Sequence, residues 1–398
     1  MSETALRPLG LLTTLGKAAS AEARAAFAAS PQWDGRRFVN PEGAHVSPSV
    51  GMAWDYLTAG SKHRKPAGEV PVVWQTAASL GPPSGGVRAV WLGHGTSLVE
   101  VEGRRVLVDP VWGEHAAPTA LAGVRRFHPA PLSLPELPAL DAVLLTHDHY
   151  DHLDAPTVAA IRDRVPRWVC PLGVGARLAG WGVAASRITE LDWWGETRIG
   201  GDARIDGRGA LRVVCTPARH FSGRGLRDRD TTLWSGWALV GAGHRALVGG
   251  DGGYSAAFAE IGRRLGPFDL ALMEIGAYSP HWADIHMGPE QAVQAARDVG
   301  AELLLPVHWG TFDLALHGWT EPAERVVVAA KAAGLPLAVP RPGQPVDAAA
   351  PPPVERWWPE LPWDDAETLP VVSAGVAERW PEARLGAGPE SGPTARAA

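Results

Sequence analysis

Residues 146–152 constrain this chain more than any other stretch, because they place three histidines and two aspartates within six positions. The preceding residues 141–145 (DAVLL) are mostly apolar and predict a buried strand. Loops that follow strand ends in an α/β sheet face the ligand-binding crevice. Imidazole nitrogens and carboxylate oxygens are ligands that Zn²⁺ takes in proteins, and this spacing lets one loop serve two ions. A metal site is therefore predicted here, and an ordinary solvated loop is the less favoured alternative.

Three further metal-binding side chains lie in the same kind of place. Each follows an apolar run that predicts a strand: His220 after residues 211–216, Asp251 after 246–250 and His308 after 303–307. Their positions at predicted strand ends strengthen the hypothesis of a metal site.

A series of short motifs carries a family resemblance over most of the chain. In chain order they are 38–41 (FVNP), 93–96 (GHGT), 108–111 (VDPV), 146–154 (THDHYDHLD), 216–220 (TPARH), 250–254 (GDGGY), 275–278 (IGAY) and 308–312 (HWGTF). With them the chain resembles the metallo-β-lactamase-fold hydrolases. More narrowly, it is similar to N-acylphosphatidylethanolamine-hydrolysing phospholipase D and its bacterial relatives. The last two motifs carry the narrower resemblance.

The resemblance implies a binuclear metal centre and assigns its ligands. One metal would be held by His147, His149 and His220, the second by Asp151, His152 and His308, and Asp251 would bridge them. Two Zn²⁺ ions are the default, although Mn²⁺ or Fe could occupy such nitrogen and oxygen ligands. No ligand position is vacant in this sequence, which argues against a non-catalytic metal-binding module, the second alternative considered.

Such a centre predicts hydrolysis. Two cations about 3.5 to 4 Å apart lower the pKa of a bridging water and neutralise charge on the attacked group. Asp151 and Asp251 are the candidates for orienting that hydroxide, with Asp251 preferred as the acceptor of its proton. His286, just before the helix predicted at residues 290–299, is the third catalytic candidate. It would donate a proton to the leaving group or hydrogen-bond a phosphoryl oxygen, and a purely structural histidine is the alternative.

The resemblance implies a phosphodiesterase of phospholipase D type. Its reaction would release an N-acylethanolamine from N-acylphosphatidylethanolamine-like lipids and leave phosphatidic acid. Hydrolysis of a lactone or another carboxylic ester, as in the related ascorbate-6-phosphate lactonase, is the alternative. Tyr150 and the Gly-Ala-Tyr of residues 276–278 favour the phospholipase branch. Acyl specificity stays open, since residues 120–138 and the N-terminal region depart from the animal enzymes.

Other residues around the motifs have less specific roles. Asp109 follows the strand predicted at residues 105–108 and is expected to support the histidine loop from behind. His94 is interpreted either as a buried supporting residue or as a substrate contact. His317 and Trp319 either line the cleft or belong to a packed loop.

The order of strand-like and helix-like segments indicates an α/β fold, and the resemblance implies the four-layer αββα sandwich. Three parts are expected: an N-terminal extension (1–86) packing on the core, a catalytic domain (87–345) and a C-terminal extension (346–398). The Pro- and Ala-rich residues 341–353 predict a linker, and the small, polar residues from 386 onward predict a disordered tail.

Composition restricts the partners. The net charge of −6 over 398 residues offers no basic footprint for nucleic acid. No segment has the apolar length of a membrane span, so a cytoplasmic enzyme with transient contact to a membrane surface is expected. The substrate would be a phospholipid or a small ester. Nothing in the sequence indicates the oligomeric state.

Overall fold

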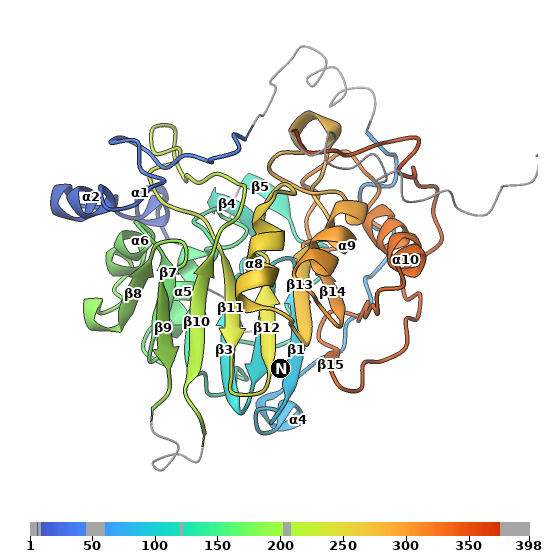
Figure 1. Cartoon of the computed structure of the whole chain (residues 1–398), viewed down its shortest axis with the longest axis horizontal. Helices are drawn as coiled ribbons and strands as arrows, with labels where there is room; N and C mark the ends of the chain where they lie inside the picture. Colours follow the sequence, from blue (N-terminus) through green and yellow to red (C-terminus); the bar gives the residue numbers. More distant parts are fainter. Residues whose placement is uncertain (1–5, 7–8, 45–59, 120–121, 202–207, 375–398) are drawn as a thin grey trace, which may run out of the picture.

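Two β-sheets lie face to face in the computed structural model, and helices cover both outer faces (Figure 1). The structure describes residues 6, 9–44, 60–119, 122–201 and 208–374. The predicted tail from residue 386 onward therefore lies outside the described residues. The layers confirm the predicted αββα sandwich.

The first sheet has seven strands in the order β15-β1-β2-β3-β6-β7-β8. β3, β6, β7 and β8 are parallel neighbours, whereas β2 runs antiparallel to β1 and β3. The strands are β1 (Val87–Gly93), β2 (Thr96–Val101), β3 (Arg104–Val108), β6 (Ala142–Leu144), β7 (Trp168–Pro171), β8 (Ile188–Leu191) and β15 (Pro345–Asp347).

The second sheet has six strands in the order β14-β13-β12-β11-β10-β9, with β12, β13 and β14 parallel. Its strands are β9 (Glu196–Ile199), β10 (Leu211–Thr216), β11 (Gly236–Val240), β12 (Arg245–Val248), β13 (Leu270–Glu274) and β14 (Leu304–Val307). A small antiparallel pair, β4 (His115–Thr119) and β5 (Ala122–Arg125), stands apart from both sheets.

Alternating side chains explain why the first sheet is covered on both faces. In β3, Val106 and Val108 belong to the main core, which also holds residues of the second sheet, while Leu107 faces the opposite way. Leu107 packs in a second core with Val158 of α5 and Leu178 of α6. Successive strand side chains point to opposite faces, so a strand that is apolar throughout needs cover on both sides.

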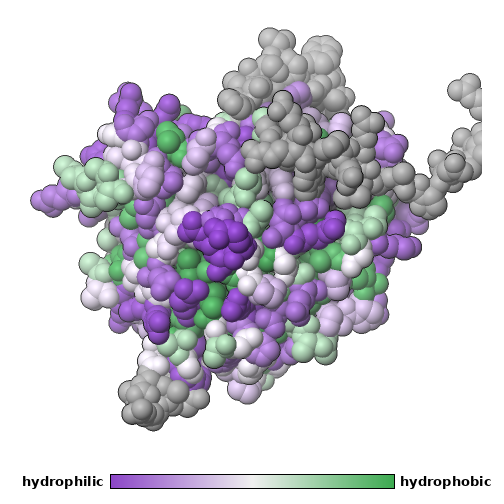
Figure 2. Space-filling view, in the orientation of Figure 1, coloured by the Kyte–Doolittle hydropathy of each residue, from purple (hydrophilic) through white to green (hydrophobic). Residues whose placement is uncertain are grey.

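The helices divide between the two outer faces. α5 (Ala155–Ile161) and α6 (Gly175–Gly180) cover the first sheet, whereas α9 (Pro289–Asp298) packs on β13 of the second and contacts α8 (Ala257–Leu265) and α10 (Glu321–Ala333). α8 buries Phe258, Ile261 and Leu265, and its Arg263 and Arg264 pair with Glu260 at the surface. Figure 2 accordingly shows a strongly hydrophilic surface over α8.

Segments before and after the two sheets contact them. The short helix α1 (Leu11–Leu15) touches β4 and α5, α2 (Ala21–Phe27) buries Phe27, and α4 (Ala77–Leu80) precedes β1. Near the other end, the rings of Trp357 and Trp358 lie 5.2 and 5.6 Å from that of Trp309. Residues 341–353, predicted as a linker, contain β15, which hydrogen-bonds with β1 at the edge of the first sheet. Within the described residues, no helix is long and apolar enough to cross a membrane.

Candidate metal centre

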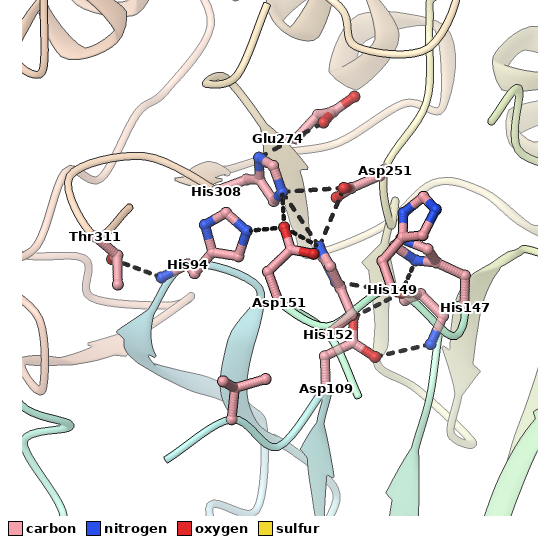
Figure 3. A network of polar contacts seen from close by, with 12 residues as sticks. His94, Asp109, His147, His149, Asp151, His152, Asp251, Glu274, His308 and Thr311 are labelled. Atoms are coloured by element: carbon pink, nitrogen blue, oxygen red, sulfur yellow. Dashed lines mark hydrogen bonds and ion pairs between the residues drawn. The ribbon is translucent and has the colours of Figure 1, made fainter. Parts of the chain in front are cut away.

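Strand ends from both sheets bring the polar motifs together. His94, Asp109 and the 146–152 loop follow β1, β3 and β6 of the first sheet. The loops after β10, β12 and β14 of the second sheet carry His220, Asp251 and His308. Figure 3 shows that side chains from these loops point toward one another. The structure thus gathers all seven predicted ligands at one edge of the sandwich, where an α/β fold places its ligand site.

The first group consists of three histidines whose ring nitrogens converge. Nε2 of His147 lies 2.8 Å from Nδ1 of His149, and Nε2 of His220 lies 3.2 Å from the same atom. Burial holds the pKa of His147 and His220 well below the ordinary value and lowers that of His149 to about 4. The three rings are therefore neutral, which is the form that binds a metal ion.

The second group lies beside the first and contains Asp151, His152 and His308. Nε2 of His308 lies 3.2 Å from Nε2 of His152 and 3.7 Å from Oδ2 of Asp151. Oδ2 of Asp251 lies 3.1 Å from His152 and 3.0 Å from His308, and 4.0 Å from His220 of the first group. Asp251 therefore touches both groups, as a bridging ligand would.

The aspartates of the centre are ionised. Burial by itself would raise the pKa of Asp251, but the neighbouring His152 and His308 lower it well below the ordinary value. The same balance lowers the pKa of Asp151, where His152 is the strongest opposing influence. Burial by itself would lower the pKa of His152 and His308, but Asp251 raises both, that of His308 to about 10. A divalent cation can take the place of the protons on these rings, so the carboxylates and imidazoles form a donor set suited to such an ion. The residues present therefore fit the metal pair that the motifs imply.

Asp109 supports the histidine loop, as its sequence position predicts. Its Oδ1 accepts the main-chain N–H of Thr146 at 2.8 Å, and its Oδ2 accepts the hydroxyl of Thr146 at 2.6 Å. The same Oδ2 lies 2.7 Å from Nδ1 of His152. Asp109 is buried and behind the ligands, so it orients His152 from the side opposite Asp251.

His94, whose role the sequence leaves open, is buried and contacts the second group. Its Nε2 lies 2.7 Å from Oδ2 of Asp151, and its ring centroid is 3.7 Å from that of His308. His94, Asp109 and His308 all have φ between 43 and 64°, a left-handed backbone that is costly for residues other than glycine. These strained turns directly after strands aim three side chains into the centre.

Not every acidic or aromatic residue of the motif faces the centre. Asp148 is fully buried and points away, since its Oδ1 accepts the N–H of Gly223 and its Oδ2 contacts Arg177. Tyr150 donates its hydroxyl proton to the carbonyl of Arg224, so it anchors that loop. These two residues build the frame around the ligands.

The region after β14 lines a pocket beside the centre. His317 and Trp319 contribute to its wall together with His94 and His308. His317 is held in place, because its Nε2 accepts the main-chain N–H of Ala277 at 3.0 Å. The rings of His317 and Tyr278 stack at 4.3 Å. His317 and Trp319 therefore line this pocket and are also packed in place, and a role for them in substrate binding stays a prediction.

Glycines flank Asp251 on both sides in residues 249–253 (GGDGG). The structure gives a reason within the protein itself. A Cβ on Gly250 would lie 2.6 Å from the carbonyl oxygen of Ser235, and one on Gly253 would lie 2.3 Å from the backbone of Asp284. The run is glycine-rich because the loop carrying Asp251 is packed against neighbouring main chain.

The motif analysis did not identify Glu274, which ends β13 and is fully buried beside the centre. Its Oε2 lies 2.7 Å from Nδ1 of the catalytic candidate His286 and 3.9 Å from Nδ1 of His308. The pattern that located the other ligands, a polar residue ending an apolar strand, also marks Glu274. It directly precedes the motif at residues 275–278.

Comparisons with known proteins agree with this geometry. Residues 104–309 match the family model for the beta-lactamase superfamily domain. The uncharacterized protein Rv0906 of Mycobacterium tuberculosis is 48% identical over 316 residues, which cover 77% of this chain and 80% of that protein. N-acyl-phosphatidylethanolamine-hydrolyzing phospholipase D 1 of Caenorhabditis elegans is 40% identical over 237 residues, covering 58% and 65%.

Among solved structures, that of Igni18, a metallo hydrolase from Ignicoccus hospitalis, gives a TM-score of 0.48 at 23% identity. It covers 65% of this chain and 97% of that one. The fold and the buried cluster of histidines and aspartates define a metal-dependent hydrolase. The family model matches more than half of the chain, and the chain belongs to the metallo-β-lactamase superfamily. The resemblance stated from the motifs is confirmed at this level.

Proposed function

We propose that the protein is a binuclear metal-dependent phosphodiesterase of phospholipase D type, acting on N-acylphosphatidylethanolamine-like lipids. The observation that carries the proposal is the position of Asp251, whose Oδ2 contacts ligands of both groups. A centre built for two ions suits a phosphodiester, because its nonbridging oxygens can contact both cations. The similarity to the Caenorhabditis elegans phospholipase supports the choice of substrate.

The proposed ligands are those implied by the motifs, with zinc as the first metal to test. His147, His149 and His220 would hold one ion, Asp151, His152 and His308 the other, and Asp251 would contact both. When bound, the ion pair supplies Lewis acidity and lowers the pKa of water held between the ions.

The chain's own residues then have distinct tasks. The carboxylate of Asp251 would take the proton of the attacking water, and Asp151, held by Nε2 of His94, would orient that water. As the new oxygen–phosphorus bond forms, the ester oxygen–phosphorus bond breaks. Solvent first protonates Nε2 of His286, whose Nδ1–H faces Glu274, and the doubly protonated ring then donates that proton to the leaving oxygen. A lipid substrate also requires transient contact with a membrane surface.

The test is product release from N-acylphosphatidylethanolamine by the purified, zinc-loaded protein. Release of N-acylethanolamine that disappears in His147→Ala and Asp251→Asn is the expected result. His244→Ala is the matched control, since the His244 side chain is 45% exposed and pairs with Asp269. A fully metallated protein that releases no product from this lipid would overturn the substrate. Turnover of lactones by that protein would instead support the carboxylic-ester alternative.

A further inference from the structure

Glu274 occupies an unusual position for a charged side chain. It is 0% exposed at the end of β13, between the loop that carries Asp251 and the segment that carries His286. Burying a carboxylate is unfavourable unless hydrogen bonds compensate for the lost water. The partners of this carboxylate therefore indicate what it does.

Both oxygens of Glu274 accept hydrogen bonds from neighbouring elements. Oε1 accepts the main-chain N–H of Gly252 at 2.7 Å and that of Met287 at 3.3 Å. Oε2 lies 2.7 Å from Nδ1 of His286. One carboxylate thus ties the residue after Asp251 to the residue after His286 and holds the His286 ring itself.

His286 is well placed to act on a substrate at the metal centre. Its ring centroid lies 5.0 Å from that of His220 and 5.3 Å from that of His308, one from each predicted ligand group. The side chain is 14% exposed, so part of it reaches solvent. Because Nδ1 faces Glu274, Nε2 on the other side of the ring is the nitrogen left for substrate.

We propose that Glu274 is a positioning residue: it accepts the Nδ1–H of His286, so that Nε2 can take up the proton that the ring passes to the leaving oxygen. The inference rests on the proposed function, in which His286 serves that oxygen. Glu274 also lies 3.9 Å from Nδ1 of His308, a buried atom without a hydrogen-bond partner within the described residues. Glu274 could therefore accept the Nδ1 proton of His308 when Nε2 of His308 binds a metal ion.

The variant Glu274→Gln tests this role of Glu274 directly, because an amide has only one acceptor oxygen. Two main-chain N–H groups face Oε1, so the amide oxygen should stay there, and the NH₂ group must then face Nδ1 of His286. A neutral His286 would have to move its proton from Nδ1 to Nε2. Glu274→Gln is therefore expected to invert the tautomer of His286 while leaving the surrounding packing in place.

The first readout is the tautomer itself. Long-range ¹H–¹⁵N spectra of the histidine rings report it, and the His286 signals are identified by their loss in His286→Gln. Wild-type protein should show Nδ1–H, and Glu274→Gln should show Nε2–H. An Nε2–H tautomer in wild-type protein, or an unchanged ring in the variant, would overturn the proposal. The wild-type spectrum by itself tests whether His286 carries its proton on Nδ1, even if Glu274→Gln fails to fold.

The second readout is catalytic coupling, measured with bis(p-nitrophenyl) phosphate and with N-acylphosphatidylethanolamine. Glu274→Gln should lower kcat by roughly 10- to 100-fold, the usual cost of losing such a supporting contact, with little change in KM. In the His286→Gln background the same change should cost almost nothing more, because both residues act through one ring. Independent, multiplying effects would overturn the proposal.

Glu321→Gln is the matched control. Glu321 is 2% exposed and accepts the hydroxyl of Tyr278 at 2.6 Å, so it tests the general effect of replacing a buried glutamate. It should leave the His286 tautomer, kcat and KM unchanged. If wild-type protein hydrolyses neither diester, the proposed function fails, and the tautomer together with the zinc content of Glu274→Gln still decides the role of Glu274. If Glu274→Gln has the same zinc content and the same His286 tautomer as the wild-type protein, the positioning role of Glu274 is rejected.

Discussion

Oδ2 of Asp109 lies 2.7 Å from Nδ1 of His152, and Nε2 of the same ring lies 3.1 Å from Oδ2 of Asp251. The two aspartates therefore hold opposite sides of one imidazole, one at the end of β3 and one in the loop after β12. Because Asp109 accepts the Nδ1 proton, Nε2 is free to face the centre. This relationship connects the first sheet to the proposed metal ligands.

Asp109→Asn should weaken metal binding. The amide oxygen would keep the N–H of Thr146, so its NH₂ group would face Nδ1 of His152 and drive the ring proton onto Nε2. Metal affinity is expected to fall roughly 10- to 100-fold, measured as zinc content against a series of chelator concentrations. Asp141→Asn, which affects a contact with Arg104 instead, is the control. Equal zinc affinity in the two variants would contradict the role of Asp109.

Asp251→Asn should lower turnover more than substrate affinity. An amide cannot take the proton of the attacking water, so kcat is expected to fall roughly 100-fold or more, while KM changes little. Zinc content must be measured in parallel, since Asp251 is also a proposed ligand. Turnover that survives in a variant with both metals bound would show that Asp251 is not the proton acceptor.

Asp148→Ala should destabilise the protein rather than alter the chemistry directly. The change removes the fully buried Asp148 from Arg177, which is 3% exposed, and leaves it with Asp228, a carboxylate that is 20% exposed. Breaking a buried pair in this way costs about 3–5 kcal/mol, measured as the free energy of unfolding in urea. Asp163→Ala removes the exposed contact with Arg162 and should cost less than about 1 kcal/mol. Similar losses in both variants would argue against a structural role for Asp148.

His128 should make the protein less stable in mild acid. Burial lowers the pKa of this ring from 6.5 to about 3. The unfolded chain therefore binds a proton below pH 6.5 that the folded protein does not accept until about pH 3. The free energy of unfolding should fall by roughly 1 kcal/mol per pH unit as the pH drops through this window.

The variant His128→Gln should make that acid slope shallower in urea titrations at a series of pH values. His244→Gln should change the slope in the opposite sense, because Asp269 raises the pKa of His244 and so stabilises the folded protein toward acid. The same change of slope in both variants would show that burial of His128 does not cause the acid sensitivity.

Local sequence patterns predicted many of the strands and helices. The apolar run 211–216 predicted β10 with the observed bounds, and the runs 246–250 and 303–307 predicted β12 and β14 to within two residues. Strands of this kind are continuous apolar runs in the sequence. The histidine or aspartate that follows such a run is recognisable as a candidate ligand from its residue type alone. Other elements lacked such a signal. β15 lies in a Pro- and Ala-rich stretch and is a strand only because it pairs with β1, some 250 positions earlier in the chain.

The sequence by itself located several strand ends, the candidate metal-binding side chains and the family, because these depend on neighbouring residues and motifs. Only the tertiary structure decided which polar groups face each other. Asp148 and Asp151 belong to the same loop, yet Asp148 turns outward to Arg177 and Asp151 turns inward to His94. Glu274 becomes a partner of His286 because β13 and the segment before α9 meet in space. Such pairings depend on the packing of distant elements, which no local pattern contains.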